Sequence, residues 1–276
     1  MKREEVNVAP DGSLLLNPFE VERQLRYHLA AMDVMGLITT SEHLSSLVKQ
    51  AMWELDAKLL RIVVEAIVAQ VAIDPGDTHS YALLCQMVVK NKQLGSSDFS
   101  VQDVVAKACQ QSYETFWRQM MMTMLGGTYA AAERQHLRTA PRSQGNRGRA
   151  LLLFIGYLYG MDVVPEWLVM HIVLEHGRNA IELPEDCLEN FACLMEIVGC
   201  SLARRTERPM LLALILKTVE TAAEHPKMSM RARQILRDML LSCYNWDLDT
   251  REEPDSVPRE IPIGHLEKSE FHTEIG

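Results

Sequence analysis

The chain of 276 residues is long enough to bury a sizeable core without a disulfide or metal staple, and its sparse Gly, Pro and aromatic residues favour helices over a β-sandwich or barrel. Its formal net charge of −9 excludes a protein that coats nucleic acid over its whole surface. No apolar run reaches the roughly 20 residues of a membrane span. Six cysteines lie mostly in apolar helical runs and the N-terminus lacks a signal-peptide core, which predicts a cytoplasmic or nuclear protein with reduced thiols.

The first half of the chain predicts a series of amphipathic helices. Residues 1–16 are expected to form a mobile lead-in. Asn17-Pro18-Phe19-Glu20 then supplies an N-cap, a proline at the first helical position and an acid at the third, which predicts a helix to about Met35. Thr39 and Glu42 repeat the capping-box spacing and predict the next helix start. Apolar residues at helical spacing predict further helices over residues 54–73, 79–94 and 100–124.

The second half contains the most apolar helix, from Ala150 to Tyr159, which has no solvent face and must be sandwiched between other helices. Before it, residues 128–138 predict a short helix and residues 139–147 an interior loop. After a turn at residues 160–162, Pro165 begins another helix, and three more are predicted over residues 184–203, 209–224 and 228–243. Residues 248–276 are acid-rich, contain three prolines and are expected to be largely disordered.

No segment shows the period-2 alternation of a β-strand. About ten helices joined by short turns, each burying a broad face, predict sequential antiparallel pairs stacked into a helical-repeat solenoid. The expected fold class is therefore all-α, with one folded domain over residues 17–247.

Five short blocks occur in order along this domain. They are Asp74-Pro75 with Tyr81-Ala82-Leu83-Leu84-Cys85; Cys109-Gln110-Gln111-Ser112-Tyr113-Glu114; Phe154-Ile155-Gly156-Tyr157-Leu158-Tyr159; Pro184 to Gly199; and Ser229-Met230-Arg231 through Leu236-Arg237-Asp238 to Asn245-Trp246. Together they resemble the middle domain of eukaryotic translation initiation factor 4 gamma over about residues 40–247. The resemblance implies a HEAT-like α-α superhelix.

The same resemblance implies a non-catalytic scaffold in translation initiation. Such a domain clasps the two lobes of a DEAD-box RNA helicase of the initiation factor 4A type, contacts mRNA through a basic surface and helps to assemble the cap-binding complex. Related domains in mRNA decay and nuclear cap-binding use the same fold for other partners. An adaptor of that kind, or a protein–protein adaptor without RNA binding, is the alternative interpretation.

Three departures from the family pattern bear on the partners. Asp77 stands where the family usually has an aromatic anchor for the helicase, and Leu153 replaces an arginine. The peptide that grips a cap-binding protein is also absent, since Tyr27 is followed by Met32 and Asp33 at the family's apolar positions. Either residues 1–38 bind a cap-binding protein through a divergent helix, or that contact lies outside this chain.

Two groups of arginines are the candidate contacts for RNA or the helicase. Arg142, Arg147 and Arg149 belong to an acid-free basic stretch over residues 134–149, and flexible arginines can follow a phosphate backbone. Arg231, Arg233 and Arg237 lie within two turns of the last predicted helix. A solvated loop in the first case and a salt-bridged helix surface in the second are the alternatives.

The sequence shows no constellation for catalysis, a cofactor or a metal ion. His171, Glu175 and His176 lie close together but lack the H-E-x-x-H order and a third ligand. Cys193 and Cys200 share a face of an apolar helix, where cysteines are usually core residues. No enzyme activity, cofactor or metal site is expected.

Overall fold

The structure, a computed structural model, describes residues 17–30, 36–51, 58–90, 100–124 and 141–249. Within these ranges it contains ten α-helices, one short 3₁₀-helix and no β-strand: α1 (Pro18–Ala30), α2 (Leu37–Ala51), α3 (Lys58–Ile73), η1 (Pro75–Asp77), α4 (Thr78–Lys90), α5 (Val101–Met124), α7 (Pro141–Gly160), α8 (Glu166–Arg178), α9 (Glu185–Arg205), α10 (Pro209–Ala223) and α11 (Met230–Asp249). The expected lead-in, the short helix over residues 128–138 and the segment from residue 250 onward lie outside the described residues.

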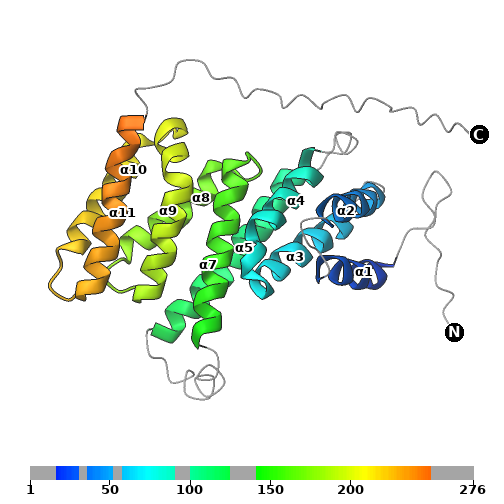
Figure 1. Cartoon of the computed structure of the whole chain (residues 1–276), viewed down its shortest axis with the longest axis horizontal. Helices are drawn as coiled ribbons and strands as arrows, with labels where there is room; N and C mark the ends of the chain where they lie inside the picture. Colours follow the sequence, from blue (N-terminus) through cyan, green and yellow to red (C-terminus); the bar gives the residue numbers. More distant parts are fainter. Residues whose placement is uncertain (1–16, 31–35, 52–57, 91–99, 125–140, 250–276) are drawn as a thin grey trace, which may run out of the picture.

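The helices alternate between two layers (Figure 1). The first layer holds α1, α3, α5, α8 and α10, and the second holds α2, α4, α7, α9 and α11. Packing runs from α2 to α4, α7, α9 and α11 along the second layer, while α1 packs on α3, α3 on α5 and α8 on α10 in the first. Stacked antiparallel hairpins of this kind confirm the predicted all-α, HEAT-like solenoid.

The apolar helix at the centre of the sequence lies at the centre of the stack. Helix α7 packs between α4 and α9 in its own layer and against α3 of the other. Phe154, Ile155 and Leu158 are fully buried there. The expectation that this helix is enclosed on nearly all sides is confirmed, and its side chains join the two halves of one continuous core.

Two side-chain helix caps are present in the structure, at the predicted Asn17 and at Ser100. The Asn17 side chain accepts a hydrogen bond from the backbone N–H of Phe19 at 3.0 Å, and Pro18 is the first residue of α1. The Ser100 hydroxyl accepts one from Asp103 N–H at 3.3 Å, at the start of α5. Both caps satisfy backbone donors that a helix end leaves without an intrahelical partner.

The predicted loop over residues 139–147 is wrong, because α7 already begins at Pro141. Proline at the first helical position loses no hydrogen bond, but Gly145, Asn146 and Gly148 are poor helix formers that argued for a loop. Packing overrides them: a β-carbon on Gly148 would lie 2.3 Å from the Phe116 ring of α5. A side chain at position 148 would fit only if the Phe116 ring moved, so the close approach of α5 and α7 favours glycine inside this helix.

Two other helix boundaries differ from the prediction. Helix α2 begins at Leu37, so that Thr39 is a helical residue rather than an N-cap, and Gly36 C=O accepts the backbone hydrogen bond of Thr40 at 2.8 Å. Helix α11 continues six residues beyond the predicted end at Cys243, to Asp249. The extension carries Trp246, which packs against the core.

Candidate functional site

The two groups of candidate arginines come from distant segments but lie along one layer of helices. Helices α7, α9 and α11 run parallel, and their first turns lie at the same edge of the molecule, the lower edge in Figure 1. Arg147 and Arg149 are near the start of α7, and Arg231, Arg233 and Arg237 near the start of α11, with α9 between them. The side chain of Arg142 lies outside the described residues.

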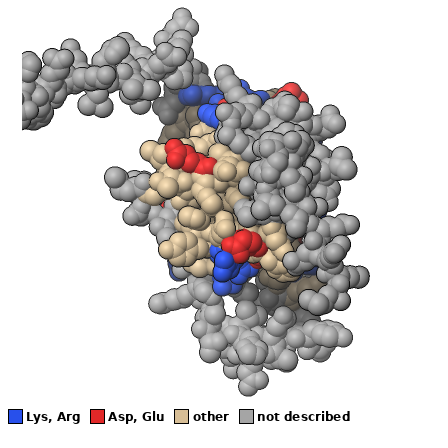
Figure 2. Space-filling view, turned by 90° about the vertical axis from the view of Figure 1, so that its right-hand side faces the viewer, with Lys and Arg blue, Asp and Glu red and all other residues tan. Residues whose placement is uncertain are grey.

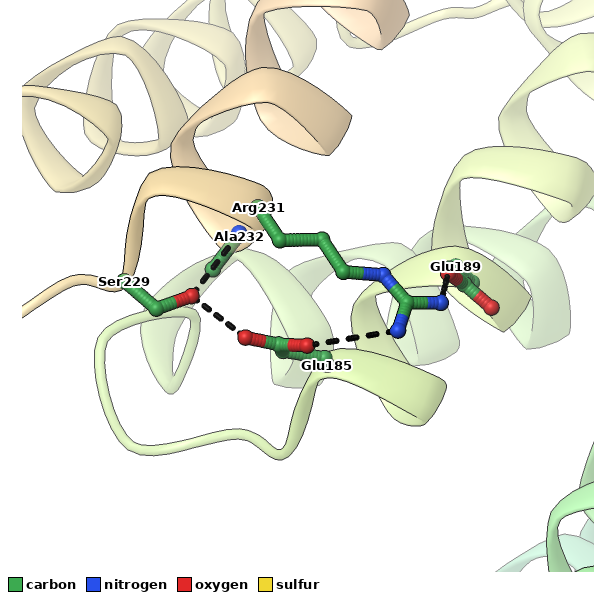
Figure 3. A network of polar contacts seen from close by, with 5 residues as sticks. All are labelled: Glu185, Glu189, Ser229, Arg231 and Ala232. Atoms are coloured by element: carbon green, nitrogen blue, oxygen red, sulfur yellow. Dashed lines mark hydrogen bonds and ion pairs between the residues drawn. The ribbon is translucent and has the colours of Figure 1, made fainter.

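Arg231 is the centre of a polar network between α9 and α11 (Figure 3). Its guanidinium donates a hydrogen bond to Glu189 and lies 3.6 Å from the second carboxylate, that of Glu185. Ser229 donates to Glu185 and accepts a hydrogen bond from Ala232 N–H at 3.0 Å, which makes it the N-cap of α11. The ion pairs raise the pKa of Arg231, chiefly through its hydrogen bond with Glu189. The network joins the start of α11 to α9 and balances the charge of Arg231.

The other two arginines of α11 bind the turn that precedes the helix. Arg237 forms an ion pair with Glu224 at 2.9 Å and remains half-exposed. Arg233 is partly buried and donates to the backbone carbonyls of His225 and Pro226 at 3.1 and 3.4 Å. Arg237 therefore offers a partly available charge to a partner, whereas Arg233 mainly supports the α10–α11 turn.

Arg147 and Arg149 are exposed on α7. Arg149 lies near Cys193 of α9: burial raises the pKa of that thiol, while the Arg149 charge and hydrogen bond lower it in part, against the effect of Glu196 and Glu189. Glu189, the partner of Arg231, also acts on the same thiol. The second-layer edge of α7, α9 and α11 is a surface of mixed charge rather than a uniformly basic one.

The position of the missing aromatic anchor lies at the tip between α3 and α4. Asp77 ends the 3₁₀-helix there and is partly buried, while Pro75 and Gly76 are exposed. Ile73, the last residue of α3, is 69% exposed beside them. The tip therefore presents an aliphatic side chain where the sequence alone indicated only an acidic one.

Figure 2 faces the end of the stack formed by α1 and α2, where the described surface is largely uncharged. Phe19 and Tyr27 of α1 are 81% and 73% exposed. The arginines of this helix, Arg23 and Arg26, form ion pairs with Glu20 and Glu22 one turn before them, at 2.7 and 2.6 Å. Aromatic side chains thus stand on α1 among balanced charges.

A groove between α8 and α10, which sequence analysis did not identify, has a volume of about 460 Å³. Its apolar lining comes from Trp167, Met170, Leu174 and Leu211, and Trp167 is 50% exposed. The Thr206 hydroxyl, between α9 and α10, donates a hydrogen bond to the Glu166 carboxylate at 2.6 Å. The sequence contains no sign of this groove, because helical periodicity does not indicate which two helices leave a space between them.

The MIF4G domain family matches residues 38–245, three quarters of the chain. The chain belongs to the MIF4G domain family. It is similar to the eukaryotic initiation factor 4F subunits p150 and p130 of Saccharomyces cerevisiae, each at 25% identity, over 94% and 72% of this chain and 30% and 23% of those proteins. It is also 19% identical to eukaryotic translation initiation factor 4 gamma of Schizosaccharomyces pombe, over 96% of this chain and 19% of that protein. The chain thus spans less than a third of these curated relatives.

Among solved structures, the MIF4G domain of Trypanosoma cruzi translation initiation factor EIF4G5 has the same fold. It superposes with a TM-score of 0.53 at 17% identity, covering 85% of this chain and all of that one. At this identity the likeness concerns the fold alone. The recognition of the family from five sequence blocks is confirmed.

His176, one of the three residues considered above as metal ligands, is a core residue of this MIF4G domain. His176 is buried, its Nδ1 lies 2.9 Å from Ile172 C=O and 3.4 Å from the Tyr113 hydroxyl, and its ring stacks on Phe191. Burial lowers the pKa of His176 to about 4, so the ring is neutral near pH 7. The described residues contain no group of three or more potential metal ligands and no helix suited to span a membrane.

The six cysteines of the described part of the chain form no disulfide, and burial raises the pKa of Cys85 and Cys243 to about 12. A thiol of this kind is protonated near neutral pH and reacts poorly as a nucleophile. Cys85, Cys109 and Cys243 belong to the core of the solenoid, whereas Cys187, Cys193 and Cys200 are partly buried.

Proposed function

We propose that this MIF4G domain is a non-catalytic scaffold of translation initiation in the cytoplasm, which binds a DEAD-box RNA helicase of the initiation factor 4A type and RNA and helps to assemble the cap-binding complex. The observation that carries the proposal is the family match over residues 38–245, together with relatives whose names are those of initiation factor 4F subunits. The solenoid offers several separate surfaces, as a scaffold requires.

The helicase is proposed to contact two places. One is the α3–α4 tip, where Ile73 supplies an apolar anchor beside Asp77. The other is the second-layer edge at α11, where Arg231 and Arg237 stand among Glu185, Glu189 and Glu224. Paired charges of both signs suit a protein surface better than a phosphate backbone, because they provide orientation without net attraction of an anion. Binding two lobes at two places favours one arrangement of the lobes, which is a population shift.

RNA is proposed to contact the start of α7. Arg147 and Arg149 are exposed there, and Arg142 precedes them on the same helix. The candidate arginines of α11 have acidic or backbone partners, so the α7 arginines carry the larger share of the expected attraction for phosphates. Arg233 donates to two backbone carbonyls, so we expect it to contribute least to binding of the helicase or of RNA.

A cap-binding protein is a further proposed partner, through residues 1–38. Phe19 and Tyr27 are exposed on α1 and provide aromatic anchors of the kind that dominate interfaces. The largely uncharged end surface around α1 and α2 supports this assignment (Figure 2).

The test is a titration with an initiation factor 4A helicase from the same source, read by calorimetry and by ATPase rate with and without RNA. Micromolar or tighter binding with faster turnover is the expected result. Ile73→Ala and Arg237→Gln should each weaken binding, and Glu65→Ala, an exposed change at mid-α3, serves as the control. Binding without any change in turnover would remove the stimulating role while leaving the scaffold.

The alternative is a related adaptor in mRNA decay or nuclear cap-binding, or a protein–protein adaptor without RNA binding. Asp77 in the place of an aromatic anchor is the observation that favours it. If the helicase fails to bind, capture of a different DEAD-box helicase in an RNA-dependent manner would support the decay or nuclear interpretation.

A further inference from the structure

The groove between α8 and α10 opens at the edge of the molecule where α11 also ends, the upper edge in Figure 1. Helix α8 begins where α7 finishes, α10 begins where α9 finishes, and the last residues of α11 lie at that same edge (Figure 1). The groove is lined by the first three turns of α8 and the first turn of α10. The C-terminal end of α11 therefore lies at the same edge of the molecule as the groove, in the neighbouring layer.

Apolar side chains continue from the groove around the exposed side of α10. Leu211 lines the groove, and at 100° per residue Leu214 and Met210 follow it around the helix, 62% and 82% exposed. On α11, Leu241 and Tyr244 are likewise about 60% exposed. Lys217 of α10, whose pKa is raised mainly by Glu220 and slightly by Tyr244, places Tyr244 beside α10. An apolar track thus joins the end of α11 to the groove.

The segment after α11 has the composition and length to follow this track. Residues 250–260 contain most of the charged side chains of this segment. Three aliphatic side chains then follow within residues 261–266, in the order Ile261-Pro262-Ile263-Gly264-His265-Leu266. Eleven extended residues span up to about 36 Å, whereas crossing one helix at a spacing of about 10 Å needs roughly 20 Å. Ile261 precedes a proline and is therefore biased to an extended conformation, which suits a narrow groove.

We propose that residues 261–266 bind in the α8–α10 groove, with residues 250–260 crossing the exposed side of α10. On this path an acid of the crossing stretch, such as Glu252 or Glu253, could pair with Arg208 at the rim of the groove. The groove, about 460 Å³ in volume, suits a short segment rather than a separate protein, since stable interfaces bury roughly 800 Å² per partner. A covalently linked segment needs less contact area, because its effective concentration at the groove is in the millimolar range.

Hydrogen exchange read by mass spectrometry on the full chain tests this proposal. The expected result is that amides of residues 261–266 exchange at least about tenfold more slowly than in a free peptide of residues 250–276. The protection should be independent of protein concentration. Peptide-like exchange throughout residues 250–276 would overturn the proposal, and protection that rises with concentration would assign the groove to a second copy instead.

Two variants and a matched control make the test specific. Leu214→Asp on the track and the pair Ile261→Asp with Ile263→Asp in the segment should each abolish the protection. Ile38→Asp, at 63% exposure on α2, matches the 62% exposure of Leu214 and should leave it unchanged. Because Leu214 is largely exposed and the isoleucines lie outside the described domain, loss of folding is not expected, and circular dichroism checks it. Protection that survives both changes would also refute the proposal.

Discussion

The indole ring of Trp246 lies directly on the backbone of Gly199: a β-carbon at position 199 would be 1.8 Å from Cζ2 of the ring. The two residues belong to α11 and α9, the last neighbouring pair of the second layer. The tryptophan of the closing sequence block is therefore a packing residue that fixes how closely these two helices approach.

Gly199→Ala should destabilise the domain. The added methyl group gains up to about 1 kcal/mol of helix propensity, but overpacking against an aromatic ring costs more, so a net loss of about 1–3 kcal/mol is expected in urea denaturation. Gly160→Ala is the control, since nothing lies within 4 Å of a β-carbon there. Combining Gly199→Ala with Trp246→Ala should show a coupling energy of similar size. Additive effects would mean that the ring and the glycine do not constrain each other.

Acid should destabilise the protein through His176. Because burial lowers its pKa from 6.5 to about 4, the unfolded chain binds a proton before the folded one does, and stability falls as the pH drops from about 6.5 to 4. The full effect of one such group is roughly 3 kcal/mol. His176→Gln cannot titrate and should flatten the plot of unfolding free energy against pH in this window. An unchanged slope would show that other groups dominate, such as His43, whose pKa is also lowered by burial.

Changing Arg147 and Arg149 to Ser should weaken RNA binding in a salt-dependent way. If both contact phosphates of single-stranded RNA, the slope of log K against log salt should become less steep by about 1.4. The same change at Arg23 and Arg26, which are exposed and ion-paired on α1, is the control and should leave the slope intact. Equal losses in both variants would indicate a general charge effect and remove α7 as the RNA site.

Asp77→Trp should strengthen helicase binding. A tryptophan at the α3–α4 tip restores an aromatic anchor beside the exposed Ile73, and a gain of about tenfold in affinity corresponds to 1.4 kcal/mol. Glu65→Trp on exposed mid-α3 tests whether an added indole alone has this effect. Calorimetric titration measures both variants, and a gain with Glu65→Trp but not with Asp77→Trp would contradict the assignment of the tip.

Ser229→Ala should cost about 1 kcal/mol of stability, because it removes the N-cap of α11 and the hydrogen bond to Glu185. Arg231→Gln should cost less stability than Ser229→Ala, since its ion pairs are exposed to solvent. For helicase affinity the order should be reversed, with Arg231→Gln the more damaging. Thermal denaturation and titration of the same two proteins give both orders.

Local chemistry determined the parts of the fold that the sequence predicted well. Asn17 and Ser100 act through side-chain hydrogen bonds to residues two and three positions away, and Pro209 acts through its own ring, so no distant information was needed. The start of α7 was mispredicted because Gly148 reads as a loop residue until Phe116, thirty-two positions earlier, is known to pack on it. Tertiary contacts thus reversed the local preference.

The candidate site was predictable only in part for the same reason. Arg231 and Arg237 were identified from the closing block, but their partners Glu189 and Glu224 lie 42 and 13 positions away, and spacing along the helix gives no sign of them. The α8–α10 groove depends on the distance between two helices that are not consecutive. Residue types indicated which side chains to consider, whereas the solenoid packing determined how much charge each has available.

The parallel arrangement of α7, α9 and α11 has an electrostatic consequence of its own. Each helix carries roughly half a positive elementary charge at its first turn and half a negative one at its last, and three aligned helices place these partial charges side by side. Helices of the first layer, such as α8 and α10, run the opposite way, so this preference for anions is confined to the second-layer face of that edge and is partly offset by the first layer. A phosphate group bound at the first turns of α7 and α11 would therefore meet favourable backbone dipoles as well as the arginines of these helices.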